Sequence, residues 1–188
     1  INDFCGAGPG YYELGDINSM KYCAKSRGEK IDVFELLYKY NPDSDALAEL
    51  VQRVVRQAEP SGMHCCDDTV DDKPHIDADV DNLYSLAIRA AKNSNEKNPA
   101  FWYYTAAFID NLRGNIHRAS DILAMAEKSK GTKYINESIK VLRIYLDAKR
   151  LPYNKAYEQR LFEQLKWLDE MICENITPLV KEKTAEFE

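Results

Sequence analysis

The sequence has few cysteines, few residues that interrupt helices, and no long apolar run. Its five cysteines are odd in number and irregularly spaced, so they do not form the pattern of a disulfide-stabilised domain. Seven prolines and eight glycines are few for 188 residues, and no apolar stretch approaches the roughly 20 residues of a membrane-spanning helix. We therefore expect one soluble domain over residues 1–188, either cytoplasmic or exported after removal of a signal.

Positive charge is also scarce. The chain has 25 basic and 31 acidic residues, and its formal net charge is -6. Seven aspartates and one lysine between residues 67 and 81 account for this whole excess, so the rest of the chain is balanced. A nucleic-acid-binding protein needs a basic surface against the phosphates, and we expect no nucleic-acid partner.

Residues 98–112 carry the clearest helical pattern. Asn98 is a favourable N-cap and Pro99 a favourable first-turn residue, because the cap side chain can accept an amide hydrogen bond and proline has no amide. Two apolar stripes follow along the helix: Phe101, Phe108 and Leu112 form one, and Trp102, Ala106 and Ile109 form the other. A surface helix needs one stripe, so two stripes predict a helix packed between neighbours.

Further apolar periods predict about eight helices in total and no sustained strand. Gly114 can adopt the left-handed conformation that ends a helix, so the helix over 98–112 and the next one, over 116–131, form a hairpin. The other predicted helices lie within 14–28, 31–40, 44–58, 77–93, 132–150 and 154–176. The last two form a second hairpin, and their apolar faces are Ile135, Ile139, Leu142 and Leu146, and Leu161, Leu165, Leu168 and Ile172.

Two segments of the chain are similar to each other. Residues 14–28 and 113–131 each have a glycine, an Asp or Asn, an isoleucine, and then a helix that ends in Lys-Ser and a basic residue before glycine. Their first glycines lie 99 residues apart, close to three units of the roughly 34-residue tetratricopeptide period. Residues 100–131 resemble one tetratricopeptide repeat. The matching positions are Ala107, Gly114, Asn115, Ile116, Ala119, Leu123 and Ala126, whereas Asp110 replaces the usual aromatic residue.

The resemblance implies an all-α fold in which antiparallel helix hairpins stack as a right-handed solenoid, and this chain would be a segment of a longer one. The first helices of such hairpins line a groove that binds peptides or partner domains. By this resemblance the partner-binding residues are Phe101, Tyr104, Phe108, Asn111 and Leu112. Tyr104 and Asn111 are the stronger candidates, because Phe101 and Phe108 also suit a hydrophobic core. The alternative fold is an irregular antiparallel bundle with one repeat-like hairpin.

An acidic inserted loop over residues 60–76 concentrates the possible zinc ligands. They are His64, Cys65, Cys66 and His75. Adjacent cysteines in an extended chain point to opposite sides, whereas zinc sites usually separate two cysteines by two residues. Nearby aspartates also raise the thiol pKa and oppose thiolate formation. We therefore predict a solvated acidic loop and no zinc site.

The aspartates after this loop resemble the start of a calcium-binding loop. Asp77, Asp79 and Asp81 have the right spacing, but Ile88 stands where the bidentate glutamate is needed. We predict no calcium site. The aspartates are instead expected to cap the helix that follows, where they face the positive end of its dipole.

No catalytic motif of the G-x-S-x-G, H-E-x-x-H or C-x-x-C type occurs, so we expect neither an enzyme nor a cofactor. The leading hypothesis is a non-catalytic scaffold that binds a protein or a peptide. The alternative is a small-molecule or glycan-binding module of an exported bacterial protein, in which 12 tyrosines and 2 tryptophans supply stacking surfaces; a metal-binding protein ranks third. A long groove with scattered rings favours a peptide, and a compact pocket with convergent polar groups favours a small ligand.

Overall fold

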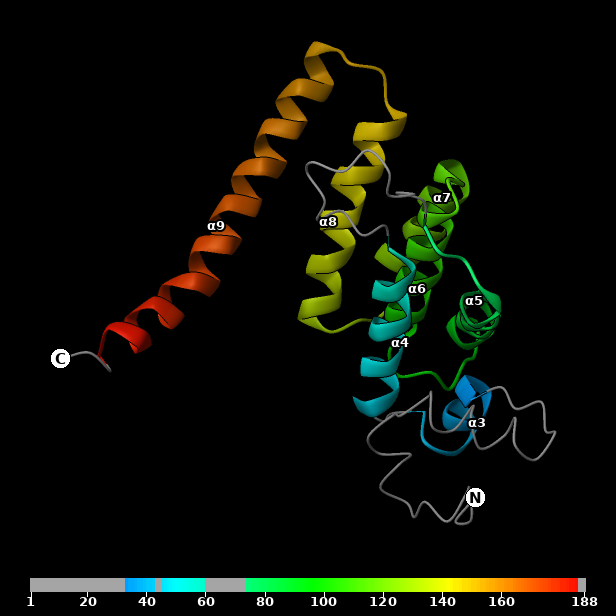
Figure 1. The fold of residues 1–188 in the computed structure, drawn as a ribbon. Helices are drawn as coiled ribbons and strands as arrows, with labels where there is room; N and C mark the ends of the chain where they lie inside the picture. The colour runs from blue at the N-terminus through cyan, green and yellow to red at the C-terminus, as the bar shows by residue number, and fades with distance from the viewer. Residues whose placement is uncertain (1–32, 43–44, 60–73, 186–188) are drawn as a thin grey trace, which may run out of the picture.

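The computed structural model of the chain describes residues 33–42, 45–59 and 74–185. These residues form seven helices and no strand (Figure 1), which confirms the all-α class. The eighth predicted helix, within residues 14–28, lies outside the described residues. The helices are α3 (Val33–Tyr40), α4 (Asp45–Ala58), α5 (Ala78–Ala91), α6 (Pro99–Leu112), α7 (Ile116–Glu127), α8 (Lys133–Arg150) and α9 (Lys155–Ala185).

α6 lies at the centre of the described helices. It packs along α5 and along α7, and it also contacts α4 and α8. Both of its predicted apolar stripes have buried members. Trp102 and Ile109 of one stripe are 2% and 0% exposed, and Phe101 of the other stripe is buried as well. A helix with neighbours on several sides needs apolar residues around most of its circumference. The prediction of a helix packed between neighbours is therefore confirmed.

A tight turn joins α6 to α7, as the sequence predicts. Gly114 has a positive φ of 77°, a left-handed conformation that glycine adopts at little cost. The amide of Gly114 donates to the carbonyl of Asn111, and the amide of Asn115 donates to the carbonyl of Asp110, each over 2.9 Å. These bonds end α6 and reverse the chain. Ala119 of α7 is then fully buried, as expected for a small residue between closely packed helices.

The start of α6 differs in one respect from the prediction. Asn98 occupies the N-cap position and Pro99 the first turn, but the Asn98 side chain makes no capping hydrogen bond. The amide of Ala100 instead donates to the carbonyl of Lys130 over 3.2 Å. Because proline has no amide and this carbonyl satisfies the next one, the side-chain cap is not needed. Gly131 permits the close approach, since a Cβ there would lie 2.8 Å from the Cβ of Ala100.

α8 packs on α6 and α7, whereas α9 is only partly covered. The predicted apolar face of α8 is buried, and its members are Ile135, Ile139, Leu142 and Leu146. α9 is 31 residues long and diverges from α8 along its length (Figure 1). Leu165 and Ile172 on its predicted apolar face are consequently 49% and 44% exposed. None of the described helices is both long and apolar enough to cross a membrane.

Candidate functional site

A cleft lies between α4, α6 and α8, three helices that are not consecutive in the chain. Its volume is about 190 Å³. The last turns of α4, the first turns and middle of α6, and the first turns of α8 surround it. The lining residues are Val51, Gln52, Val55 and Arg56 of α4, Glu59 just after α4, Phe101, Tyr104, Thr105 and Phe108 of α6, and Tyr134, Ile135 and Ser138 of α8.

The cleft combines buried apolar side chains with exposed polar ones. Phe101 and Ile135 belong to the buried core. Tyr104 and Phe108 are half-buried, and their ring centroids lie 6.1 Å apart. Tyr134 is 65% exposed and stands at the edge. An apolar concavity with a polar edge can take up an apolar group, because burial removes both surfaces from water.

The hydroxyl groups of the cleft differ in their availability. Thr105 Oγ1 donates to the Phe101 carbonyl over 2.9 Å, and Ser138 Oγ donates to the Tyr134 carbonyl over 3.0 Å. Both bonds stay within one helix. Burial raises the pKa of Tyr104 to about 12, and the nearby Tyr134 and Glu59 side chains add to the effect. The Tyr104 phenol therefore stays protonated at physiological pH and can donate a hydrogen bond.

The structure brings three of the five predicted partner-binding residues to this cleft. Phe101, Tyr104 and Phe108 line it, but Asn111 and Leu112 do not. Asn111 Oδ1 is buried without a hydrogen-bond partner, and Leu112 packs against the core. Three of the five predicted residues therefore share this cleft, and partner binding by all five stays a prediction. The other two lie outside it because the cleft follows only the first and middle turns of α6, and both residues lie in its last turn.

The residues of α4 and α8 that complete the cleft were not predicted from the sequence. The sequence resembles the repeat only over residues 100–131. The resemblance therefore assigns groove positions only within that hairpin. A usable signal was present, because the same resemblance places the first helices of neighbouring hairpins along one groove. Extended to the next predicted helix, it would have pointed to Tyr134 and Ser138, which lie in the first turns of α8.

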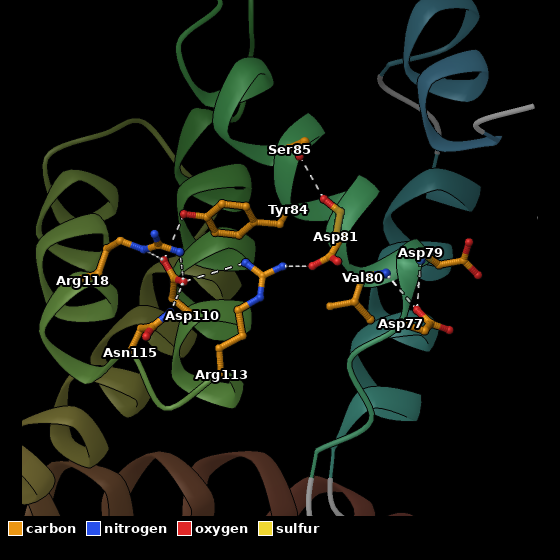
Figure 2. Close-up of polar contacts among 10 residues, drawn as sticks. All are labelled: Asp77, Asp79, Val80, Asp81, Tyr84, Ser85, Asp110, Arg113, Asn115 and Arg118. Carbon is orange, nitrogen blue, oxygen red and sulfur yellow. Dashed lines mark hydrogen bonds and ion pairs between the residues drawn. The ribbon is translucent and has the colours of Figure 1, made fainter.

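A network of ion pairs and hydrogen bonds around one buried carboxylate joins α5, α6 and α7 (Figure 2). At its centre is Asp110 of α6, which is 0% exposed. The carboxylate accepts hydrogen bonds from Arg118 Nε at 2.7 Å, from the Tyr84 hydroxyl at 3.0 Å and from Asn115 Nδ2 at 3.3 Å. The guanidinium of Arg113 lies 4.5 Å from the centroid of the Tyr84 ring. Figure 2 shows side chains from α5, from α7 and from the turn between α6 and α7 converging on this one carboxylate.

The network is charged and internally satisfied. Burial alone would raise the pKa of Asp110, but the hydrogen bonds from Arg118, Asn115 and Tyr84 outweigh burial and hold the pKa below its ordinary value of 3.8. Burial and the hydrogen bond to Asp110 raise the pKa of Tyr84. Asp110 is thus hydrogen-bonded within the protein, and the network positions α6 relative to its neighbours.

The segment that follows the acidic loop behaves as a helix cap. Asp77 Oδ1 accepts hydrogen bonds from the amides of Asp79 and Val80, each over 3.0 Å, which confirms the capping prediction. His75 is exposed, and the other candidate zinc ligands lie within residues 60–73, outside the described residues. In the described part of the chain, no group of three or more His, Cys, Asp or Glu side chains is placed to hold a metal ion.

Comparisons of the chain with family models, with curated proteins and with solved structures give no match.

Proposed function

We propose that the chain is a non-catalytic helical-repeat scaffold whose α4/α6/α8 cleft binds a segment of a protein partner. The observation that carries this proposal is the convergence of Phe101, Tyr104 and Phe108 with residues of two other helices in one apolar concavity. In this proposal α4/α5, α6/α7 and α8/α9 are successive tetratricopeptide-like hairpins, and the cleft follows their first helices. The contacts of α6 with both α4 and α8 support that arrangement.

The size of the cleft favours one side chain of a protein over a free small molecule. Its volume is about 190 Å³. An apolar cavity of about 150 Å³ accommodates benzene, whereas small-molecule sites usually measure roughly 300–1,000 Å³. The cleft therefore has room for one aromatic ring or one large aliphatic side chain. A single anchoring side chain in a desolvated pocket is the usual energetic centre of a protein interface.

The side chains in and around the cleft can contact both the anchoring side chain of the partner and the partner residues next to it. Burial of a large apolar side chain contributes about 1.5–3 kcal/mol. The neutral phenol of Tyr104 can donate to a main-chain carbonyl of the partner. Gln52 and Arg56 on α4 and Tyr134 on α8 lie around the same cleft, where they can contact the residues on either side of the anchor.

The absence of catalysis is part of the proposal. A hydroxyl nucleophile needs a base within hydrogen-bond reach. The two aliphatic hydroxyls of the cleft, on Thr105 and Ser138, donate instead to main-chain carbonyls of their own helices. The Tyr104 phenol, with a pKa of about 12, remains protonated and is a poor base at neutral pH. We therefore propose binding without chemistry and without a cofactor.

The test is selection from a library of displayed peptides about 12 residues long, followed by fluorescence anisotropy with the enriched peptides. We expect the enriched peptides to share one aromatic or large aliphatic residue. Replacing Tyr134 by Ala removes exposed area at the cleft edge and should weaken their binding at least about tenfold, or about 1.4 kcal/mol.

The matched control is Tyr40→Ala on α3. Tyr40 and Tyr134 are similarly exposed, at 60% and 65%, but only Tyr134 lines the cleft. The control variant should bind the peptides as the unaltered chain does. The proposal is rejected if no peptide family is enriched, or if both variants weaken binding equally.

A further inference from the structure

α9 carries an apolar surface that the other described helices leave uncovered. Phe162, Leu165 and Ile172 of α9 are 65%, 49% and 44% exposed, and Tyr153, in the turn before α9, is 75% exposed. α9 packs chiefly on α8 and diverges from it along its length (Figure 1), so its outer side is open to a second molecule. Contiguous exposed apolar surface usually marks an interaction site.

The exposed side of α9 has a regular order of charges. Phe162 has charged residues four and seven positions away in both directions, and residues at these spacings share one side of a helix. Before Phe162 come Lys155 and then Glu158, and after it come Lys166 and then Asp169. All five residues are exposed. Along the helix, this stripe is therefore positive, negative, aromatic, positive and negative.

The order of charges is complementary to itself when two copies run in opposite directions. In an antiparallel pair of α9 helices centred on Phe162, a residue seven positions before the centre lies opposite the residue seven positions after it. Lys155 then faces Asp169 of the second copy, and Glu158 faces Lys166 of the second copy. In a parallel pair in register, each charge would face its own like charge, which is unfavourable. The stripe therefore suits a second copy of α9 in the antiparallel direction.

The apolar residues follow the same symmetry. Phe162 lies opposite Phe162 of the second copy, and two aromatic rings in contact attract each other. Tyr153 lies nine positions before this centre and Ile172 ten positions after it, so Ile172 comes opposite the turn that holds Tyr153 of the second copy. Leu165 lies next to the central pair of rings. One antiparallel pair thus covers all four exposed apolar side chains.

The area of this surface suits a weak dimer. From their exposed fractions, the four apolar side chains present on the order of 400 Å² per copy. Homodimer interfaces are about 65% apolar, so two copies would bury about 1,200 Å² in total. Specific interfaces begin at about this size. We therefore expect a Kd of about 10–100 µM.

The existing ion pair of the stripe is no obstacle to these contacts. Lys166 Nζ lies 4.0 Å from Oε1 of Glu170, and the two side chains are 62% and 61% exposed. Such an exposed pair contributes little to stability, because water screens it. Lys166 can therefore exchange this contact for one with Glu158 of the second copy at small cost.

We propose that two copies of the chain associate through an antiparallel pair of α9 helices, with the two-fold axis at Phe162. This interface includes no residue of the α4/α6/α8 cleft, so peptide binding and dimerisation can fail independently. At about 1 µM protein, well below the expected Kd, the chain is a monomer. Hydrogen exchange of α9 at that concentration reports the uncovered helix.

Sedimentation equilibrium over about 1–300 µM protein tests the proposal. The average mass should rise from the 21.6 kDa of one chain towards twice that value. Phe162→Ala removes the central contact and should weaken association at least about tenfold. Tyr40→Ala is the control, because Tyr40 is similarly exposed, at 60%, but lies on α3. The control variant should associate as the unaltered chain does.

An exchange of charges tests the direction of the pair. Lys155→Glu places acidic residues opposite each other at both ends of the interface and should weaken association at least about fivefold. Adding Asp169→Lys to the same chain restores opposite charges, so this double variant should associate as the unaltered chain does. Circular dichroism checks that each variant keeps its helices. The proposal is overturned if the chain stays a monomer at about 300 µM, if Phe162→Ala and Tyr40→Ala associate equally, or if the double variant associates no better than Lys155→Glu.

Discussion

Asp110 is a fully buried carboxylate at a position where the tetratricopeptide resemblance implies an aromatic side chain. The aromatic ring in this region comes instead from Tyr84 of α5, whose hydroxyl donates to Asp110 over 3.0 Å. Arg118 of α7 supplies the opposite charge. Burial of a charge is costly unless the charge is paired and hydrogen-bonded. The cost of burying the Asp110 charge is therefore offset by residues on two neighbouring helices.

Replacement of Asp110 by Asn should destabilise the fold. The change keeps the shape of the side chain but removes the charge that Arg118 faces, and hydrogen bonds to charged groups contribute about 1.5–3 kcal/mol. We expect a loss of about 2 kcal/mol in the free energy of unfolding at pH 7, measured by urea denaturation. Asp121→Asn is the control, because Asp121 is exposed on α7 and should change stability by less than about 0.5 kcal/mol.

The stability lost in the Asp110→Asn variant should also depend on pH. The pKa of Asp110 in the folded state lies below 3.8, so the ionised network contributes fully above the unfolded-state pKa of about 3.9. That contribution is lost as the pH falls through the folded-state pKa. The stability difference between the unaltered chain and Asp110→Asn should therefore be equal at pH 7 and pH 5 and shrink at pH 3 and below. A difference that grows on acidification would contradict this assignment.

At the scale of helices, α6 and α9 show that an apolar stripe in the sequence is not always covered by another helix. α6 has neighbours on several sides, and its Trp102 and Ile109 are almost entirely buried. α9 is more than twice as long but packs chiefly on α8. Phe162 and Leu165 of α9 remain 65% and 49% exposed. Most of the stability of a helix comes from packing of its apolar face. Packing therefore stabilises each turn of α9 less than each turn of α6.

Hydrogen exchange should show this difference between the two helices. Amides of α9 over residues 161–172 should exchange at least about tenfold faster than those of α6 over residues 102–112, because local opening is easier where few apolar contacts are broken. The measurement is hydrogen–deuterium exchange followed by mass spectrometry at neutral pH. Equal protection of the two segments would mean that a further contact covers α9 in solution, such as a second copy of the chain.

At the scale of the whole molecule, the two cavities arise from helices that are distant in the sequence. The α4/α6/α8 cleft joins residues from Val51 to Ser138, and a second cavity, between α7, α8 and α9, joins residues from Glu127 to Trp167. α8 contributes residues to both cavities, so its position decides where each one lies.

The charge distribution predicts that the molecule avoids nucleic acids. The formal net charge is -6, and binding to nucleic acid depends on contacts between phosphates and basic residues. We expect no saturable binding of fluorescently labelled 20-nucleotide DNA or RNA at protein concentrations up to about 100 µM in physiological salt, which is the weak limit of the usual range of non-specific affinity. Binding that weakens steeply with added salt would contradict the expectation and reveal a basic surface.

The candidate site was predictable where local pattern and tertiary packing agree. Phe101, Tyr104 and Phe108 lie at i, i+3 and i+7 on one helix, so their shared face follows from the helical period, and all three line the cleft. The same period places Asn111 near that face, but the cleft does not reach it. How far a cleft extends along α6 depends on where the neighbouring helices begin and end, and no period within α6 carries that information.

The amino-acid sequence by itself determined the helices, the turn at Gly114 and the apolar stripes, because these depend on backbone conformations and on residues three or four positions apart. The tertiary structure alone decided which helices enclose the cavities, how Asp110 acquired its partners from α5 and α7, and why α9 keeps an exposed apolar face. Those features depend on contacts between residues far apart in the chain, and such contacts are set by the packing of whole helices against one another.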